Sequence, residues 1–490
     1  MSSLNRSVRH AGAATINRSG HPAYAMDDKT KLVIMALTSM LAEPKFYGDT
    51  ASDLLMLAQD LCRAGEGAFV AKLAVWARTK GNIRSVSHVL MAVVAHECTG
   101  QAFVRPAVRV VASRRGDDGT ELLATYHALF GESVRWPHAL QRGVRDALEG
   151  MSAFQIAKYQ SRGREFTLRD TLRIAHPVPR DAEAARAMRR CVEGTLAVPK
   201  GWESELSARG NTAEVWNELI VEHRLGYMAL LRNLRNIVAS GADYDPVLKV
   251  LSDAGNVRRA RQLPFRYYSA WRELSAAGLM TTSIARALDQ ALAASCESAG
   301  SLPGRTAVLV DTSGSMGFPL SIGSKVTCRD VAAVLCALLT RMCDDAWVCR
   351  FDTSASALTL LGTSVLADIR SVPASGGGTN MIAGFDRLMQ SGFDADRVVV
   401  LSDCEVNMAF GGRTSGMRTR TVQNALDAYR AHVGHDVWCH ALDLQGYGTQ
   451  QFAGPKVNVM AGWSEQVLRF VALAEHGFGG LVNAIEAVRL

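Results

Sequence analysis

The chain has 490 residues, of which 48 % are hydrophobic and 21 % are charged. This balance is typical of a globular protein and excludes a disordered or fibrous chain. At roughly 100–200 residues per domain, the length predicts two or more domains. No apolar run reaches the roughly 18 residues that a membrane-spanning helix needs. The 10 cysteines include no Cys-x-x-Cys pair, which favours free thiols in a reducing cytoplasm over disulfides or a zinc site.

Basic residues are concentrated in the first part of the chain. Residues 1–300 hold 39 of the 54 Lys and Arg residues and 30 of the 47 Asp and Glu residues, a formal charge of +9. Residues 301–490 hold 15 and 17, a formal charge of −2. This asymmetry suggests an anionic partner for the first part. A solvated basic surface without a partner is the alternative, and the charge alone leaves both open.

The first part of the chain has a helical pattern. Residues 1–25 are polar and lack an acidic residue, so we expect a flexible tail and not a signal peptide. From about residue 29 to residue 297, apolar residues recur at helical spacing, as Leu54, Leu57 and Leu61 do, and Gly and Pro residues separate the segments. The spacing predicts an α-helical domain over residues 26–297, with the short helices of a helical-repeat array.

The pattern changes after a linker of small residues, 298–304. Strands are predicted at 306–310, 347–351, 398–401, 437–442 and 457–460, and helices at 326–343, 382–389, 421–433 and 465–474. This alternation predicts an α/β domain over residues 303–490 with a mostly parallel sheet covered on both faces. Ligands of such sheets bind beyond the carboxyl ends of the strands, where Asp311 and Asp403 are expected.

One motif in this second domain has the composition of a metal site. In the run Asp311–Ser315, Asp311, Ser313 and Ser315 alternate, so an extended loop would place all three side chains on one side. Thr379, in a Gly-rich loop, and Asp403 would add two oxygen ligands. Carboxylate and hydroxyl oxygens suit a hard cation, Mg²⁺ or Mn²⁺. Taken alone, the first motif is equally well explained as a turn that caps a helix.

Catalytic interpretations fit less well. Gly317–Lys325 has the wrong spacing for a phosphate-binding loop. A phosphoaspartyl enzyme would carry a carboxylate where Ser313 stands, and Cys404 has the apolar surroundings of an inert buried thiol. No His or Glu motif is placed to serve as a general base. We therefore predict no catalytic residue and rank a metal-dependent phosphoesterase last.

The first domain contains a basic segment at residues 137–177. Lys158 and Arg162 are four residues apart, so they would share a helix face, where phosphates could offset their repulsion. Arg164 continues the basic character. His176 precedes Pro177, so it is expected to end a helix, where its ring can stack on a base. A solvated basic face is the alternative, because no zinc-finger, KH or RNA-recognition signature is present.

Two resemblances combine these features. Residues 303–490, with Asp311, Ser313, Ser315, Thr379 and Asp403 in order, resemble the von Willebrand factor A domain and its metal-ion-dependent adhesion site. Residues 140–177 resemble the TROVE module of the Ro ribonucleoprotein autoantigen family, and further similar segments lie at 229–234, 262–270 and 457–463. The similarity extends from about residue 26 to the end of the chain and suggests a bacterial-type member.

The resemblance implies a ring of HEAT-like helical repeats closed by a von Willebrand A domain. It implies a cytoplasmic, non-catalytic RNA-binding protein that holds small non-coding Y-like RNA on the outer surface, at Lys158, Arg162 and His176. Single-stranded ends of misfolded RNA would enter a basic central hole. An RNase or adaptor protein is a further expected partner. The alternative function is a metal-dependent docking scaffold for an acidic partner protein.

Overall fold

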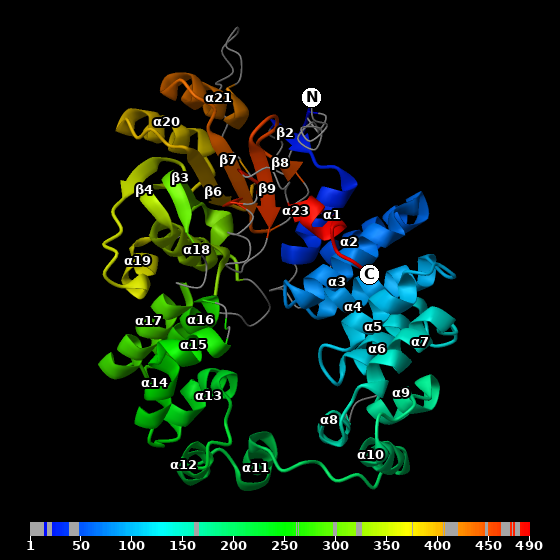
Figure 1. Ribbon diagram of the computed structural model, residues 1–490. Coiled ribbons are helices and arrows are strands. Elements are labelled where there is room, and N and C mark those ends of the chain that lie inside the picture. Colours follow the sequence, from blue (N-terminus) through cyan, green and yellow to red (C-terminus); the bar gives the residue numbers. More distant parts are fainter. Residues whose placement is uncertain are drawn as a thin grey trace. The chain divides into compact units, whose positions relative to one another are not determined.

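The computed structural model describes residues 14–16, 22–38, 49–160, 166–260, 262, 264–296, 301–319, 326–374, 376–404, 406, 420–445, 449–461, 471–472, 474–475 and 481–490. Within these ranges, no helix is long and apolar enough to cross a membrane. The chain forms two compact units (Figure 1). We call Asp28–Lys200 with Leu481–Leu490 the helical unit, and Gly201–Gly480 with Met1–Asp27 the sheet unit.

The helical unit consists of short helices joined by short connections. They are α1 (Asp28–Thr38), α2 (Asp49–Leu61), the π-helical turn η2 (Cys62–Glu66), α3 (Gly67–Thr79), α4 (Ser85–Glu97), α5 (Val104–Ala112), α6 (Asp118–Phe130), α7 (His138–Glu149), α8 (Ala153–Lys158), α9 (Leu168–Ala175), α10 (Ala182–Glu193) and α23 (Leu481–Glu486). Gly65, at a φ of 90°, bends the chain between α2 and α3, a conformation that favours glycine.

Close packing joins α5 to α7. A Cβ atom added at Gly143 of α7 would lie 2.5 Å from Val108 and 2.8 Å from the backbone oxygen of Arg105, both on α5. The side chain of Arg105 forms a two-pronged ion pair with Asp146 of α7, with both N–O distances at 2.8 Å. The absence of a side chain at Gly143 therefore sets how closely these helices approach.

The end of the chain belongs to the helical unit. α23 contacts α1 and α3. Lys29 of α1 forms an ion pair with Glu486 at 3.1 Å, and Lys72 of α3 donates a hydrogen bond of 2.6 Å to the backbone oxygen of the same residue. Residues about 400 positions apart in sequence thus complete one helical packing.

In the sheet unit, a second group of helices precedes the sheet. They are α11 (Trp202–Arg209), α12 (Ala213–Val221), α13 (Tyr227–Ala239), α14 (Asp245–Ser252), α15 (Ala254–Ala260), α16 (Pro264–Ala276) and α17 (Thr282–Cys296). Tyr268 of α16 donates a 2.9 Å hydrogen bond to the buried Asp330, and Asp289 of α17 accepts one of 2.9 Å from Ser364. These helices are thereby joined to the α/β part of the same unit.

The α/β part contains a six-stranded sheet in the order β5-β4-β3-β6-β7-β9. Its elements are β3 (Leu302–Asp311), the 3₁₀ turn η4 (Gly314–Gly317), α18 (Cys328–Met342), β4 (Cys343–Phe351), β5 (Ala355–Leu358), α19 (Val365–Ser371), α20 (Met381–Ser391), β6 (Arg397–Ser402), α21 (Val422–Val433), β7 (Trp438–Asp443) and β9 (Val457–Ala461). All neighbouring pairs are parallel except β4 with β5.

The core explains why the central strands have no polar alternation. In β3, Leu309 lies opposite Cys349 of β4 and Val400 of β6, and all three side chains are fully buried. α20 and α21 pack on the face of the sheet that includes Leu309, while α18 packs against β3 and β4 on the other (Figure 1). A parallel strand covered on both faces is apolar throughout.

The predicted elements compare well with this fold. Between α1 and α17 the described residues contain no strand, as predicted, and every strand and helix predicted between residues 303 and 460 has a counterpart. The analysis missed β5 and α19. Most of the helix predicted at 465–474 lies outside the described residues. Whether the helices form repeats stays a prediction.

Within the flexible tail expected over residues 1–25, residues 14–16 and 22–25 form strands, and residues 1–13 and 17–21 lie outside the described residues. β1 (Ala14–Ile16) and β2 (Pro22–Ala25) form an antiparallel pair, and β2 also pairs with β8 (Thr449–Gln450). Strands of two to four residues carry almost no sequence pattern. In addition, β8 lies more than 400 residues from β2 in the sequence, so a local analysis does not find this pairing.

A buried ionic network holds the amino-terminal end of β6 in the sheet unit. Arg397 contacts Glu475 with distances of 2.6 and 2.8 Å, and Nε2 of His440 lies 3.0 Å from the same carboxylate. Nδ1 of His440 lies 3.1 Å from the amide nitrogen of Asn458. Burial alone would raise the pKa of Glu475, but the hydrogen bonds from His440 and Arg397 lower it to about 2.

Candidate functional site

Three aspartates lie at the carboxyl ends of adjacent strands. Asp311 ends β3, Asp403 directly follows β6 and Asp443 ends β7. Because these strands are parallel neighbours, the three residues lie at one edge of the sheet, and all are fully buried. The sequence analysis did not select Asp443. Its signal is the same as that of Asp403, an aspartate that follows an apolar strand.

The loop after β3 brings together the first predicted ligands. The backbone N–H of Ser313 donates to Oδ1 of Asp311 at 2.8 Å, and the hydroxyl of Ser402 donates to Oδ2 at 2.5 Å. The hydroxyl oxygens of Ser313 and Ser315 are 3.2 Å apart. Ser313 is buried and Ser315 is half-buried, so the loop presents hydroxyl oxygens next to a buried carboxylate.

A second loop is hydrogen-bonded to the first. The N–H of Gly314 donates to the carbonyl of Gly377 at 3.1 Å, and the N–H of Gly376 donates to the carbonyl of Thr312 at 2.9 Å. Gly377 has a φ of 73°, a left-handed conformation that favours glycine. Thr379, two residues later, is 1 % exposed. The Gly-rich loop therefore places the fourth predicted ligand beside the β3 loop.

The charges at this edge repel one another. Burial, together with the negative charge of Asp403, raises the pKa of Asp311 to about 7. Burial also raises the pKa of the Cys328 thiol to about 12, and the charges of Asp403 and Asp443 add to this shift. Like charges near 4–6 Å disfavour each other's ionised form, so a cation at this edge would stabilise the ionised carboxylates.

The donor set fits a hard divalent cation. Two carboxylates and three hydroxyls are the oxygen ligands that Mg²⁺ and Mn²⁺ take, with water completing the shell. In the part of the chain that the structure describes, no group of three or more His, Cys, Asp or Glu side chains has a metal-binding arrangement. A cation here would therefore depend on the hydroxyl ligands as well as the aspartates.

The second candidate region lies in the helical unit, on α8, α9 and α10. Each of these helices begins with a side-chain cap. Ser152 and Gln155 form a capping box at α8, Thr167 and Asp170 form one at α9, and Asp181 accepts the N–H of the third residue of α10. Such caps satisfy the first free N–H groups of a helix. They explain why these short helices begin where they do.

The exposed face of α9 carries a basic stripe. Leu168 and Leu172 are buried, whereas Arg169, Arg173 and His176 are exposed at positions i, i+4 and i+7. Residues at this spacing lie on one side of a helix. The stripe therefore ends at His176, the residue that the sequence analysis selected.

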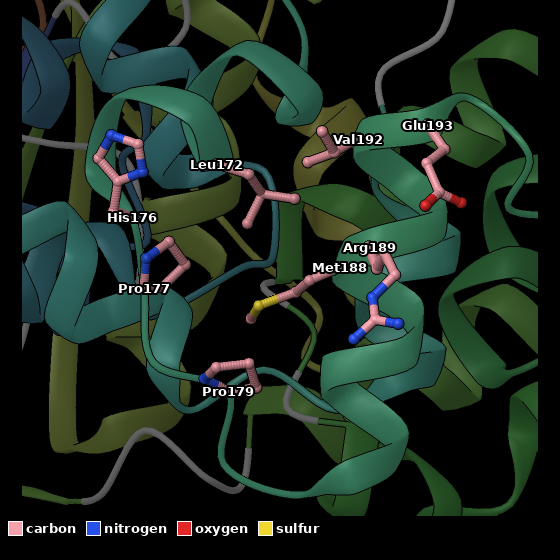
Figure 2. A pocket seen from close by; sticks show the side chains of 8 residues that line it. All are labelled: Leu172, His176, Pro177, Pro179, Met188, Arg189, Val192 and Glu193. Atoms are coloured by element: carbon pink, nitrogen blue, oxygen red, sulfur yellow. The ribbon is translucent and has the colours of Figure 1, made fainter.

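His176 ends α9, as predicted from the proline that follows it. It has a φ of 47° and a ψ of 57°, and its N–H donates to the carbonyl of Leu172 at 3.1 Å. A left-handed conformation is uncommon for a residue other than glycine. Pro177 cannot continue the helix. The imidazole is exposed at the rim of a pocket between α9 and α10 (Figure 2).

Lys158 is the last residue of α8 and is exposed. Its Nζ lies 5.7 Å from the ring centroid of Tyr159, and the guanidinium of Arg115 lies 5.5 Å from the same centroid. Because α8 ends at Lys158, the prediction that Lys158 and Arg162 share one helix face is wrong. Arg162 and Arg164 both lie outside the described residues.

Some exposed arginines of the helical unit have carboxylate partners and others have none within the described residues. In α5 and η2, Arg105 and Arg63 form ion pairs with Asp146 and Glu97. Five exposed arginines on α9 and α10 form no ion pair with any carboxylate of the described chain: Arg169, Arg173, Arg186, Arg189 and Arg190. With Lys158, His176 and the exposed Phe154 of α8, they form what we call the basic surface.

Sequence reasoning missed the part of this surface that comes from α10. Ala184, Ala187 and Met188 are buried, so the arginines at 186, 189 and 190 must face outward. That helical period could have identified them. Phe154 was not selected because a single aromatic residue on a short helix resembles a core residue.

Comparisons with known proteins find similarity over part of the chain. Residues 182–293 match the TROVE domain. Telomerase protein component 1 of Mus musculus is 42 % identical over 96 residues, and that of Rattus norvegicus is 45 % identical over 78 residues. These stretches are 19 % and 15 % of this chain, and they span only 4 % and 3 % of the two relatives.

The fold is similar to that of a solved structure. The crystal structure of the Deinococcus radiodurans Ro (Rsr) protein matches with a TM-score of 0.62 and 20 % sequence identity. The match covers 94 % of this chain and 99 % of the other. The structural match includes both the helices and the six-stranded sheet, and the TROVE match covers part of the helices. Residues 182–293 thus match the TROVE domain, and the fold as a whole is similar to that of the Ro protein.

Proposed function

We propose that this protein binds RNA through the basic surface of α8, α9 and α10. The observation that carries the proposal is the group of five exposed arginines that have no carboxylate partner in the described chain. Uncompensated cations on one surface attract the phosphates of a nucleic acid, and this attraction does not depend on sequence. The match of residues 182–293 to the TROVE domain supports the same function.

The exposed rings suggest single-stranded or unpaired RNA as part of the ligand. Phe154 is 61 % exposed and lies four residues before Lys158 on α8, so both side chains lie on one side of that helix. Bases stack on exposed aromatic rings while nearby cations hold the backbone. We propose small non-coding, Y-like RNA and the single-stranded ends of misfolded RNA as ligands, with an RNase or adaptor protein as a further partner.

The test is to purify the protein from its own cells and sequence any RNA that copurifies. We expect a defined small RNA in the wild type and its loss in the charge-reversed variant Arg169→Glu/Arg173→Glu. Lys80→Glu is the control, because Lys80 is also an exposed cation of the helical unit. If no RNA is retained at low salt, or if the variant retains as much as the wild type, the proposal is wrong.

We also propose that Asp311, Ser313, Ser315, Thr379 and Asp403 hold Mg²⁺ or Mn²⁺, with Asp443 close by. The support is the group of buried carboxylates at this edge, where burial and the negative charge of Asp403 raise the pKa of Asp311 to about 7. A cation bound there would be able to coordinate a further oxygen ligand. That ligand would be an RNA phosphate or, in the alternative function, a carboxylate of an acidic partner protein.

A further inference from the structure

The pocket between α9 and α10 has a volume of about 370 Å³, within the range of small-ligand sites. Its floor consists of the buried side chains of Leu172 and Met188, and prolines 177 and 179 form the wall opposite α10 (Figure 2). The loop that carries the prolines is anchored to α7, because the N–H of Val178 donates to Glu149 at 3.1 Å. This hydrogen bond fixes the proline loop to α7.

The polar groups of the pocket lie at its rim. His176, Arg189 and Glu193 are exposed and line the opening. Arg189 and Glu193 are four residues apart on α10, a spacing at which opposite charges can pair. They form no ion pair, and Figure 2 shows their charged ends separate from one another.

A pair of the same order and spacing elsewhere in the unit does form an ion pair. Arg145 and Glu149 of α7 have the same order and spacing, and they form an ion pair at 3.5 Å. At the pocket, the guanidinium and the carboxylate therefore stay available to a ligand. A flat, apolar molecule with hydrogen-bonding groups on its edges matches walls of this kind.

We propose that this pocket takes one unstacked guanine base of the bound RNA, an inference that rests on the proposed RNA binding. Guanine presents N7 and O6 as acceptors for an arginine. Its N1–H and amino group are donors that a glutamate can accept. The thioether of Met188 and the proline rings provide the apolar contacts for the base. The unpaired arginines of the basic surface would hold the flanking phosphates, which favours a nucleotide over an apolar peptide as the occupant.

The experiment compares binding of oligouridine with binding of the same oligomer carrying one central guanosine, adenosine or cytidine. Fluorescence anisotropy at fixed salt gives the affinities. A bidentate base contact typically contributes about 1–3 kcal/mol, so we expect the guanosine oligomer to bind about tenfold more tightly than oligouridine. Glu193→Gln should abolish this preference while oligouridine binds as tightly as before or more tightly.

The effect of Glu193→Gln on the affinity for each oligomer distinguishes loss of a base contact from a general electrostatic effect. Removal of a negative charge near RNA should tighten binding of every oligomer, so only loss of a base contact weakens binding of the guanosine oligomer alone. Glu183→Gln is the matched control, since Glu183 is also exposed on α10 but does not line the pocket. Val192→Phe, which fills the pocket from α10, should also remove the preference.

The outcomes separate this inference from the proposed function. Two results would refute guanine binding in the pocket but not RNA binding. One is equal affinity for all oligomers, and the other is a guanosine preference that survives both Glu193→Gln and Val192→Phe. Failure of every oligomer to bind at low salt would overturn both. Loss of the guanosine preference in both pocket variants, with circular dichroism showing unchanged melting, would support the inference.

Discussion

Replacing Arg169 and Arg173 together by glutamine should flatten the salt dependence of RNA binding. Each cation that contacts a phosphate of double-stranded nucleic acid changes the slope of log K against log salt by about −0.9, or about −0.7 for a single strand. If Lys158 and the five exposed arginines of the basic surface all contact phosphates, the slope should be about −5.

The double variant should reduce that slope by about two. Over a fourfold rise in salt, the wild type should therefore lose about tenfold more affinity than the variant. Fluorescence anisotropy with a labelled hairpin RNA that carries a single-stranded tail, measured over a salt series, gives both slopes. Because the two arginines form no ion pair in the described chain, their replacement leaves no carboxylate exposed in their place.

A charge-matched control distinguishes local contacts from overall charge. Arg63→Gln/Lys80→Gln removes two positive charges from exposed positions of the helical unit outside α8, α9 and α10. We expect its slope to equal that of the wild type. An unchanged slope in the Arg169/Arg173 variant, or an equal flattening in the control, would refute the assignment of RNA binding to this surface.

Three further predictions concern the metal site and stability. Mg²⁺ should raise the Tm of the wild type, and Asp403→Asn should abolish this rise in calorimetry, whereas the exposed Asp436→Asn should keep it. In the folded state the pKa of Glu475 is about 2, against an ordinary value of 4.5. This difference stabilises the folded state by about 3 kcal/mol above pH 4.5, and the stabilisation is lost as the pH falls to 2. Chemical denaturation of Glu475→Gln should show no such pH dependence, and an unaltered pH profile would contradict the prediction. Gly143→Ala should cost about 1–3 kcal/mol in urea unfolding, because its Cβ would meet Val108 and a backbone oxygen of α5; an unchanged midpoint would show that the helices can separate freely.

The main features of the α/β part could be predicted from local pattern. A parallel strand buried on both faces is a continuous apolar run, and residues 306–310 and 398–401 have that pattern. Asp311 and Asp403 follow those runs directly, so their place at one edge of the sheet follows from the strand direction. The same rule would have found Asp443, had it been applied to the strand that ends there.

Other features depend on information that local pattern does not carry. α8 ends at Lys158, and no glycine or proline near that residue indicates the end. Arg189 and Glu193 have the spacing of an ion pair, and only the coordinates show that they do not form one. The pairing of β2 with β8 joins positions more than 400 residues apart. Such contacts are determined by the tertiary fold, and the local sequence of each short segment carries little information about them.

The assignment of α23 to the helical unit has a consequence for how the protein forms during synthesis. Lys29 and Lys72 lie on helices that precede the strands of the six-stranded sheet in the sequence, yet their partner Glu486 follows those strands. Domains generally fold as units from the amino terminus during translation. Here the helical unit stays incomplete until residues 201–480 of the sheet unit have been synthesised, so its early helices must wait for α23. A ribosome stalled shortly before residue 481 would therefore hold a helical unit that still lacks this helix.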